Sequence, residues 1–212
     1  MKKTVIIDYE SGNLFSVFHA CKMLGLDPLI SNKTDDVHNA AGVILPGVGA
    51  FGDAMQNLYH SGMSDAIREY IADERPFLGI CLGMQLLFEK SEEFGDNIGL
   101  GLVKGKVKKF IFSDTHIKVP HVGWNRIYKQ EDVNSNSSIL KNVSQGDYMY
   151  FVHSYYVEPT DEKDITSMTD YEGKNFCSSI MKKNIFATQF HPEKSGKSGI
   201  SILKEFALLV TK

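Results

Sequence analysis

Cysteine is scarce in this 212-residue sequence, which has three cysteines, at positions 21, 81 and 177. An odd number of such widely separated cysteines excludes a disulfide framework and a zinc site built from paired cysteines. No apolar run reaches the roughly 20 residues that a membrane-spanning helix needs, and the start of the sequence lacks the apolar stretch of a secretory signal. We therefore expect a soluble, cytoplasmic protein.

The sequence also lacks a large excess of either charge. Its net charge is −3 and its pI about 6.2, which gives no electrostatic reason to expect nucleic acid or a membrane surface as a partner. The composition is that of a globular protein, and the length fits one α/β domain over residues 1–212. Lysines 104, 106 and 108 alternate as on the solvated face of a strand, although a docking patch for another protein would have the same pattern. The polar stretch 131–138 is typical of a surface loop.

The apolar pattern indicates an α/β fold. Short runs at 3–8, 41–47 and 76–80 are apolar on both faces and alternate with helical patterns such as 14–24, which predicts parallel strands covered on both sides. The second half of the sequence has strand patterns with few helices between them, and we expect antiparallel strands and hairpins at one side of the sheet. A last helix is expected over about 195–211. The predicted fold has three layers, with a mostly parallel central sheet flanked by helices and additional antiparallel strands in the C-terminal half.

The stretch GICLGMQ, residues 79–85, places Cys81 between two glycines. A strand that ends at Cys81 and a helix that begins at Leu82 would form a nucleophile elbow, a turn so tight that the residues two positions away must be small. A helix over 82–90 would favour a thiolate at its N-terminus, and the Leu82 N–H would face a developing oxyanion. The alternative is that Cys81 is a small core residue and the glycines only permit close packing.

A cysteine nucleophile needs a histidine held by a third group. Four of the seven histidines are expected at the surface, namely His19, His38, His60 and His116. His191 ends an apolar strand pattern, and Glu193 follows two positions later, on the same side of an extended chain. This spacing predicts a triad in the order Cys81, His191, Glu193. A strand-end histidine followed by a surface glutamate is the alternative.

Two motifs, GICLGMQLLF and QFHPEKSG, resemble those of the class I glutamine amidotransferase family, whose triad is Cys, His and Glu with the last two in His-x-Glu. The stretches LPGVGAFGDAM, PHVGWN, YFVHSYY and DYESGN are similar to the branch of that family that serves histidine biosynthesis, and the likeness covers about residues 4–210. It implies that Cys81 attacks the carboxamide of glutamine, that His191 transfers protons and that Glu193 orients His191. No cofactor and no metal are implied.

The resemblance also implies how the substrate is held. Backbone N–H groups of Leu82 and of Val48 or Gly49 would bind the oxyanion, and a glycine at position 49 would permit the peptide flip that this requires. The alternative for the PGVG stretch is a simple turn that ends a strand. The implied glutamine-binding residues are Gln85, Glu93, Ser154 and Tyr155. A carboxylate at Glu93 would pair with the α-ammonium group, although Glu89, Glu92 and Glu93 could equally form a solvated charged face. Cys21 and Cys177 are expected to be structural, and His153 is expected to be part of the core and wall of the site.

The partner implied by the resemblance is a cyclase of (β/α)8-barrel type, which would form a heterodimer with this chain and receive its ammonia. The residues implied at the interface or the ammonia passage are Asn13, His121, Trp124, Tyr150 and Lys194. For Trp124, the only tryptophan, core packing is the alternative to an interface anchor. Two other functions stay open: a duplicated subunit that serves another synthase, such as one that transfers nitrogen in surface-sugar synthesis, and a non-catalytic binding subunit.

Overall fold

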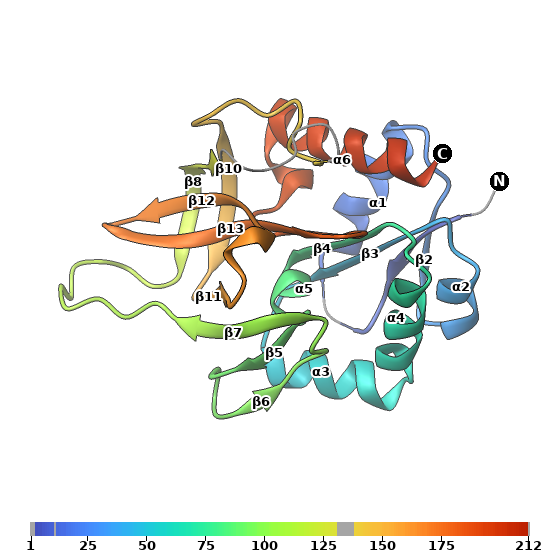
Figure 1. The fold of residues 1–212 in the computed structure, drawn as a ribbon, viewed down its shortest axis with the longest axis horizontal. Coiled ribbons are helices and arrows are strands. Elements are labelled where there is room, and N and C mark those ends of the chain that lie inside the picture. Colours follow the sequence, from blue (N-terminus) through green and yellow to red (C-terminus); the bar gives the residue numbers. More distant parts are fainter. Residues whose placement is uncertain (1–2, 11, 131–137, 212) are drawn as a thin grey trace.

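The computed structural model describes residues 3–10, 12–130 and 138–211 (Figure 1). Within these residues, twelve strands join in one sheet and two more form a separate antiparallel pair. No helix in the described part of the chain is long and apolar enough to cross a membrane. Almost all of the polar stretch 131–138 lies outside the described residues, so its assignment as a loop stays a prediction.

The parallel part of the sheet contains the three strands predicted in the first half of the sequence. Its strands lie in the order β2 (Pro28–Ser31), β1 (Thr4–Ile7), β3 (Gly42–Gly47), β4 (Phe77–Cys81) and β14 (Ile185–Thr188). β14 was expected among the antiparallel additions, and it does pair antiparallel with β13, but its parallel pairing with β4 on the other side was not predicted. All four residues of β14 are buried, as is usual for a strand covered on both faces, and this burial suits its place beside β4.

The rest of the sheet is mostly antiparallel, as predicted. From β14 it continues through β13 (Lys174–Lys182), β11 (Tyr155–Pro159), β7 (Val103–Lys109), β5 (Phe88–Ser91) and β6 (Asn97–Ile98), with β12 (Ile165–Tyr171) and β9 (Tyr128–Lys129) attached to β13. The separate pair consists of β8 (His121–Arg126) and β10 (Tyr148–His153). Along β7, Val103 and Val107 are buried while Lys104 is exposed, which confirms the alternation read from the lysines.

Helices cover both faces of the parallel strands, which confirms the three layers (Figure 1). The first helix, α1 (Leu14–Met23), and the last, α6 (Gly196–Val210), share one apolar core with Ile6 and Leu78. Helices α3 (Phe51–His60) and α4 (Met63–Ala72) share a second core with Val5 and Phe77, on the other face. Neighbouring strand residues thus enter opposite cores, as the alternation of side chains along a strand requires.

The chain after Cys81 differs from the prediction. Helix α5 (Leu82–Gln85) is only four residues long, and the chain then enters β5, so the helix expected over 82–90 is wrong beyond Gln85. Leu86, Leu87 and Phe88 are all fully buried. Because a continuous apolar run carries no period, the sequence could not distinguish a buried helix from a strand here.

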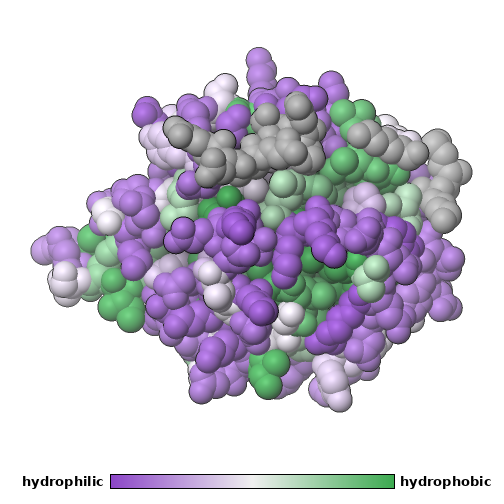
Figure 2. Space-filling view, viewed as in Figure 1, coloured by the Kyte–Doolittle hydropathy of each residue, from purple (hydrophilic) through white to green (hydrophobic). Residues whose placement is uncertain are grey.

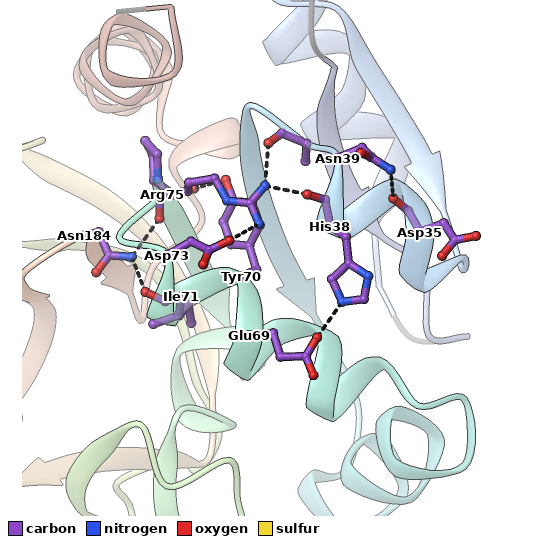
Figure 3. Close-up of polar contacts among 11 residues, drawn as sticks. Asp35, His38, Asn39, Glu69, Tyr70, Ile71, Asp73, Arg75 and Asn184 are labelled. Atoms are coloured by element: carbon purple, nitrogen blue, oxygen red, sulfur yellow. Dashed lines mark hydrogen bonds and ion pairs between the residues drawn. The ribbon is translucent and has the colours of Figure 1, made fainter.

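Polar contacts fix the amino end of β4 (Figure 3). Arg75 donates to the His38 carbonyl at 2.6 Å, and its guanidinium lies 4.1 Å from the centre of the Tyr70 ring. Asn184, just before β14, donates to the carbonyls of Ile71 and Arg75 at 3.1 and 2.8 Å. These contacts connect α2 (Thr34–His38), α4 and the start of β14. Cys81 lies at the opposite, carboxyl end of β4, where α/β sheets place their sites.

Candidate active site

Cys81 occupies a strained turn between β4 and α5. Its φ and ψ are 55° and −111°, a backbone conformation that L-residues rarely adopt and that is concentrated at functional sites. A Cβ added at Gly83 would overlap the carbonyl oxygen of Leu45 in β3, and one added at Gly79 would lie 2.8 Å from the Gly83 carbonyl oxygen. The two glycines are therefore required by the packing of this turn.

The short α5 changes one part of the expected electrostatics. A helix of four residues has a small dipole, so the dipole expected from a helix over 82–90 contributes less than predicted. The N–H groups of a first helical turn still lack partners within the helix, and Leu82 is the first of these residues. The electrostatic stabilisation of a charge beside the sulfur therefore comes from these unpaired N–H groups rather than from the dipole of a long helix.

His191 and Glu193 form a buried pair. Nδ1 of His191 and Oε1 of Glu193 are 2.9 Å apart, and their side chains are 3% and 1% exposed. The local conformation is not the extended one that the spacing suggested, because Pro192–Lys194 form a 3-10 turn closed by the Lys194 N–H on the His191 carbonyl at 3.0 Å. Proline suits the first position of such a turn, and the two side chains meet across it.

The electrostatic environment of His191 includes the sulfur of Cys81. Burial lowers the pKa of His191, but the nearby Cys81 sulfur and the hydrogen-bonded Glu193 carboxylate raise that pKa more, to about 10. In the described residues, Nε2 is buried and makes no hydrogen bond of ordinary length and angle. Cys81 is thus near enough to influence the imidazole, and Nε2 is left for a proton that moves between the two groups or to a substrate.

A cavity of about 270 Å³ opens at Cys81. It is smaller than the roughly 300–1,000 Å³ of sites for drug-sized ligands, so it suits a molecule of amino-acid size. Its walls contain all of the predicted oxyanion and glutamine-binding residues, namely Val48, Gly49, Leu82, Gln85, Glu93, Ser154 and Tyr155. His153 is also in the wall, where it was expected.

The segment after β3 lies beside the cysteine because Gly47 and Cys81 are paired in the β3–β4 register. Val48 and Gly49 follow directly and reach the cavity wall. Gly49 has a φ of 101°, in the region that favours glycine. This placement brings the Val48–Gly49 peptide to the same cavity as the sulfur, so its role as an oxyanion donor stays a prediction.

The side chains of Gln85 and Glu93 already have protein partners. Nε2 of Gln85 donates to the Tyr155 carbonyl and to Oε1 of Gln189, both at 3.0 Å. Oε2 of Glu93 accepts from the Phe51 N–H at 2.7 Å, at the start of α3, and burial raises the pKa of this carboxyl. Because Glu93 is half-buried at the cavity, it does not belong to a solvated face with the exposed Glu89 and Glu92.

Two groups near the sulfur were missed in the sequence. Gln189 is fully buried, and its Nε2 lies 3.7 Å from Sγ of Cys81. Its position two residues before His191 in a strand pattern was the available signal. The hydroxyl of Tyr9 is buried without a partner in the described residues, and its pKa is raised by burial and by the nearby charge of Cys81.

The other cysteines and the candidate metal ligands have a simpler placement. Cys21 and Cys177 are free and buried; burial, with a smaller effect of Glu193, raises the pKa of Cys21 to about 12, and burial also raises that of Cys177. These two positions suit the structural role that we expected. Within residues 3–10, 12–130 and 138–211, no three His, Cys, Asp or Glu side chains are placed to hold a metal ion.

Three of the expected interface residues gather beside His191. The ring of Tyr150 lies 6.5 Å from the His191 ring and 6.0 Å from that of Trp124, and Nζ of Lys194 is 6.0 Å from the centre of the Tyr150 ring. Trp124 is 55% exposed, which excludes core packing for this side chain. Asn13 is exposed just before α1.

His121, expected at the interface or the ammonia passage, lies away from the surface, and its role there stays a prediction. It is 3% exposed, and its Nδ1 lies 3.1 Å from Nε2 of His153. Its ring stacks on Tyr171 with a centroid distance of 4.0 Å. The side chain therefore belongs to an aromatic core behind the cavity rather than to the surface, because the alternation along β8 turns it inward.

Comparison with known proteins gives the family. A family model described as "Glutamine amidotransferase class-I" matches residues 5–210. The chain belongs to the class I glutamine amidotransferase family. It is 47% identical over 205 residues to the imidazole glycerol phosphate synthase subunit HisH of Aquifex aeolicus, covering 96% of this chain and 95% of the relative. The HisH subunit of Bacillus subtilis is 43% identical over 210 residues, or 98% of this chain and 96% of the relative.

Solved structures confirm the fold. A crystal structure of a glutamine amidotransferase superposes with a TM-score of 0.74 at 15% identity, covering 98% of this chain and 99% of the other. PurLQS from Thermotoga maritima gives a TM-score of 0.73 at 18% identity, with the same coverage. At such low identity, these structures establish the class I amidotransferase fold and nothing finer.

Proposed function

We propose that this protein is the glutaminase subunit of an imidazole glycerol phosphate synthase, which hydrolyses glutamine to glutamate and ammonia for histidine biosynthesis. The observation that carries the proposal is the strained Cys81 at an amino-acid-sized cavity, close to the buried His191–Glu193 pair. The relatives that share 43–47% of this sequence over nearly its whole length are HisH subunits of such synthases. We propose that residues 1–212 act as one glutamine amidotransferase domain in the cytoplasm.

In the proposed reaction, the Cys81 thiolate attacks the carboxamide carbon of glutamine, and a carbon–sulfur bond forms. The charge on the carbonyl oxygen is stabilised by backbone N–H groups of Leu82 and of Val48 or Gly49, which line the cavity. The carbon–nitrogen bond then breaks as Nε2 of His191 donates a proton to the leaving nitrogen, which departs as ammonia. His191 next removes a proton from water, whose oxygen attacks the thioester carbon; the carbon–sulfur bond then breaks, which releases glutamate and restores the Cys81 thiolate beside a protonated His191.

Three features of the site support this division of roles. The Glu193 carboxylate fixes the imidazole through Nδ1 and stabilises its protonated form, which the raised pKa of His191 reflects. The free oxygen of Glu93 is available for the α-ammonium group of glutamine, because its other oxygen already accepts from Phe51. Gln85 and the backbone of Ser154 and Tyr155 complete the binding wall.

The ammonia acceptor is proposed to lie on a cyclase subunit of (β/α)8-barrel type that forms a heterodimer with this chain and makes imidazole glycerol phosphate and AICAR. Val122, Trp124 and Tyr148 expose large apolar side chains on the β8–β10 pair. Figure 2 shows further hydrophobic surface at the left of the molecule, where the chain between β7 and β8 projects in Figure 1 and where Ile111 is exposed. We propose that Asn13, Trp124, Tyr150 and Lys194 contact this partner and that His121 acts from behind the surface.

Co-purification with a barrel cyclase, followed by a glutaminase assay with and without an acceptor analogue, tests the proposal. Cys81→Ala should abolish glutamate release while the complex still makes product from added ammonia. Full glutaminase activity in Cys81→Ala would refute the mechanism. Pull-down of a different synthase would favour a duplicated subunit. A non-catalytic subunit would be favoured if a glutamine-analogue electrophile leaves Cys81 of the native complex unlabelled.

A further inference from the structure

We propose that Gln189 belongs to the reaction centre: its side-chain amide donates a hydrogen bond that holds the Cys81 sulfur as a thiolate, and Gln85 positions that amide. The inference rests on the proposed function, in which Cys81 is the nucleophile. It assigns a role to a residue outside the Cys–His–Glu triad, the oxyanion donors and the wall of the cavity.

Gln189 is held in place along its whole length. It follows β14 directly, its backbone N–H donates to the Ser178 carbonyl at 2.9 Å, and its side chain is fully buried. Nε2 lies 3.7 Å from Sγ of Cys81, while Oε1 accepts from Nε2 of Gln85 at 3.0 Å. Because the side chain is not exposed to solvent, its two ends hydrogen-bond with these protein neighbours.

The direction of this amide follows from a backbone carbonyl at the far end of the chain of hydrogen bonds. The Tyr155 carbonyl can only accept, so the Gln85 group that contacts it at 3.0 Å must be the NH2 end. The second hydrogen of that NH2 group is then directed to Gln189, which must present its oxygen. The NH2 end of Gln189 is therefore left facing the sulfur. Reversing either amide would place two acceptors or two donors against each other.

A donor directed at sulfur favours the charged form of the cysteine. A hydrogen bond to an ionised group is about twice as strong as one between neutral groups. The neutral thiol has a different partner, since Sγ lies 3.8 Å from the Val152 carbonyl, which can accept the thiol proton. The structure thus provides an acceptor for the neutral thiol, the Val152 carbonyl, and a donor for the thiolate, the Gln189 amide. The hydrogen bond from Gln189 is stronger to the thiolate than to the thiol.

Other ionisable groups also face the sulfur and enter any pH measurement. His191 and Tyr9 lie near enough to Cys81 for its charge to raise their pKa values, and His153 and Glu93 line the same cavity. All four are unchanged in a Gln189 variant, so a difference between that variant and the native protein reports on the amide itself.

The test is the pH profile of Cys81 alkylation by iodoacetamide in the full chain, read by peptide mass spectrometry. Gln189→Met keeps an unbranched side chain of similar length but removes the donor. We expect the midpoint of its profile to move upward by about one pH unit, or about tenfold slower alkylation below the midpoint, because only the thiolate reacts. Gln189→Glu should move the midpoint further, since a carboxylate repels the thiolate. The kcat/KM for glutamine in the complex should fall by about tenfold with Gln189→Met.

Ser178→Ala is the matched control. It removes a buried hydroxyl that lies 2.8 Å from Ser167 Oγ, next to Gln189 in the sheet, without touching the sulfur. It should lower stability and leave the alkylation profile unchanged. Alkylation of the buried Cys21 and Cys177 reports any variant that fails to fold. If the Gln189 variants fail to fold, the native protein gives a second test. The NMR resonance of its Gln189 side-chain amide should shift with pH over the same range as the rate of Cys81 alkylation.

The outcomes separate this inference from the proposed function. A Gln189→Met profile that superimposes on the native one, or an amide resonance that does not follow Cys81, would overturn the inference while leaving the nucleophile in place. Glutamate release by Cys81→Ala would instead remove the proposed function itself. A midpoint shift in Gln189→Met with none in Ser178→Ala would support the role of Gln189.

Discussion

Gly83→Ala tests the geometry that places the cysteine. The added Cβ would overlap the Leu45 carbonyl oxygen and lie 2.8 Å from the Leu45 carbonyl carbon. Both atoms belong to the backbone of β3, which cannot move aside as the end of a flexible side chain can, so α5 must shift away from the sheet. Overpacking of a core costs about 1–3 kcal/mol, and a backbone clash belongs at or above the upper end of that range.

A loss of about 3 kcal/mol corresponds to a fall in Tm of about 6–12 °C for a protein of this size. The matched control is Gly25→Ala, where φ is 81° and no atom lies within 4 Å of the added Cβ. This control incurs only left-handed backbone strain, about 1–2 kcal/mol.

Denaturant unfolding gives the free energies, and iodoacetamide gives the reactivity of Cys81. We expect Gly83→Ala to be the less stable variant and to alkylate more slowly at Cys81 in its folded state. The reasoning is refuted if Gly83→Ala is as stable as Gly25→Ala and its Cys81 reacts at the native rate.

Four further predictions follow from individual contacts. Glu193→Gln keeps the shape of the pair but removes the charge that favours imidazolium, so kcat/KM in the complex should fall by about 10²–10⁴-fold; a change under threefold would contradict the role. Because the folded-state pKa of His191 is raised to about 10, its contribution to the free energy of unfolding should be complete below about pH 6.5 and be lost as pH rises through 10. Urea unfolding should show this fall in the free energy of unfolding with pH in the native protein, and a smaller fall in Glu193→Gln. Trp124→Ala should weaken cyclase binding by at least about tenfold in calorimetry with no loss of folding stability, since the side chain is exposed. Tyr9→Phe should leave the free energy of unfolding unchanged or raise it, because the Tyr9 hydroxyl has no hydrogen-bond partner in the described residues. A decrease of more than about 1 kcal/mol would contradict this and show that the hydroxyl does have a partner.

The elements that the sequence predicted well are those set by local patterns. The strands at 4–7, 42–47 and 77–81 were visible as runs that are apolar on both faces, and the elbow was visible as a cysteine between two glycines. A side chain at either glycine would clash with the backbone of the turn or of the adjacent strand β3. The spacing of the glycines around Cys81 therefore indicates the tight turn from the sequence alone. The contact between His191 and Glu193 was also predicted from their spacing, although the chain between them forms a 3-10 turn rather than the extended segment expected.

The features that were missed depend on distant parts of the chain. Phe88 begins a strand rather than continuing a helix because Val103 pairs with it. His121 turns inward because the aromatic residues of other strands enclose it. The role of Gln189 depends on Gln85, 104 positions earlier, and on the sulfur at 81. The local strand pattern could indicate at most which side of the strand His121 and Gln189 occupy, whereas their partners come from distant parts of the chain and are shown only by the fold.

The central claim is that the Cys81 sulfur forms a covalent bond with the substrate. The most direct measurement is mass spectrometry of the cyclase complex quenched in acid during glutamine turnover. The account predicts a γ-glutamyl thioester on the peptide that contains Cys81, with none in Cys81→Ala. Steady glutamate release by a complex whose Cys81 peptide never carries that adduct, together with activity in the alanine variant, would contradict it.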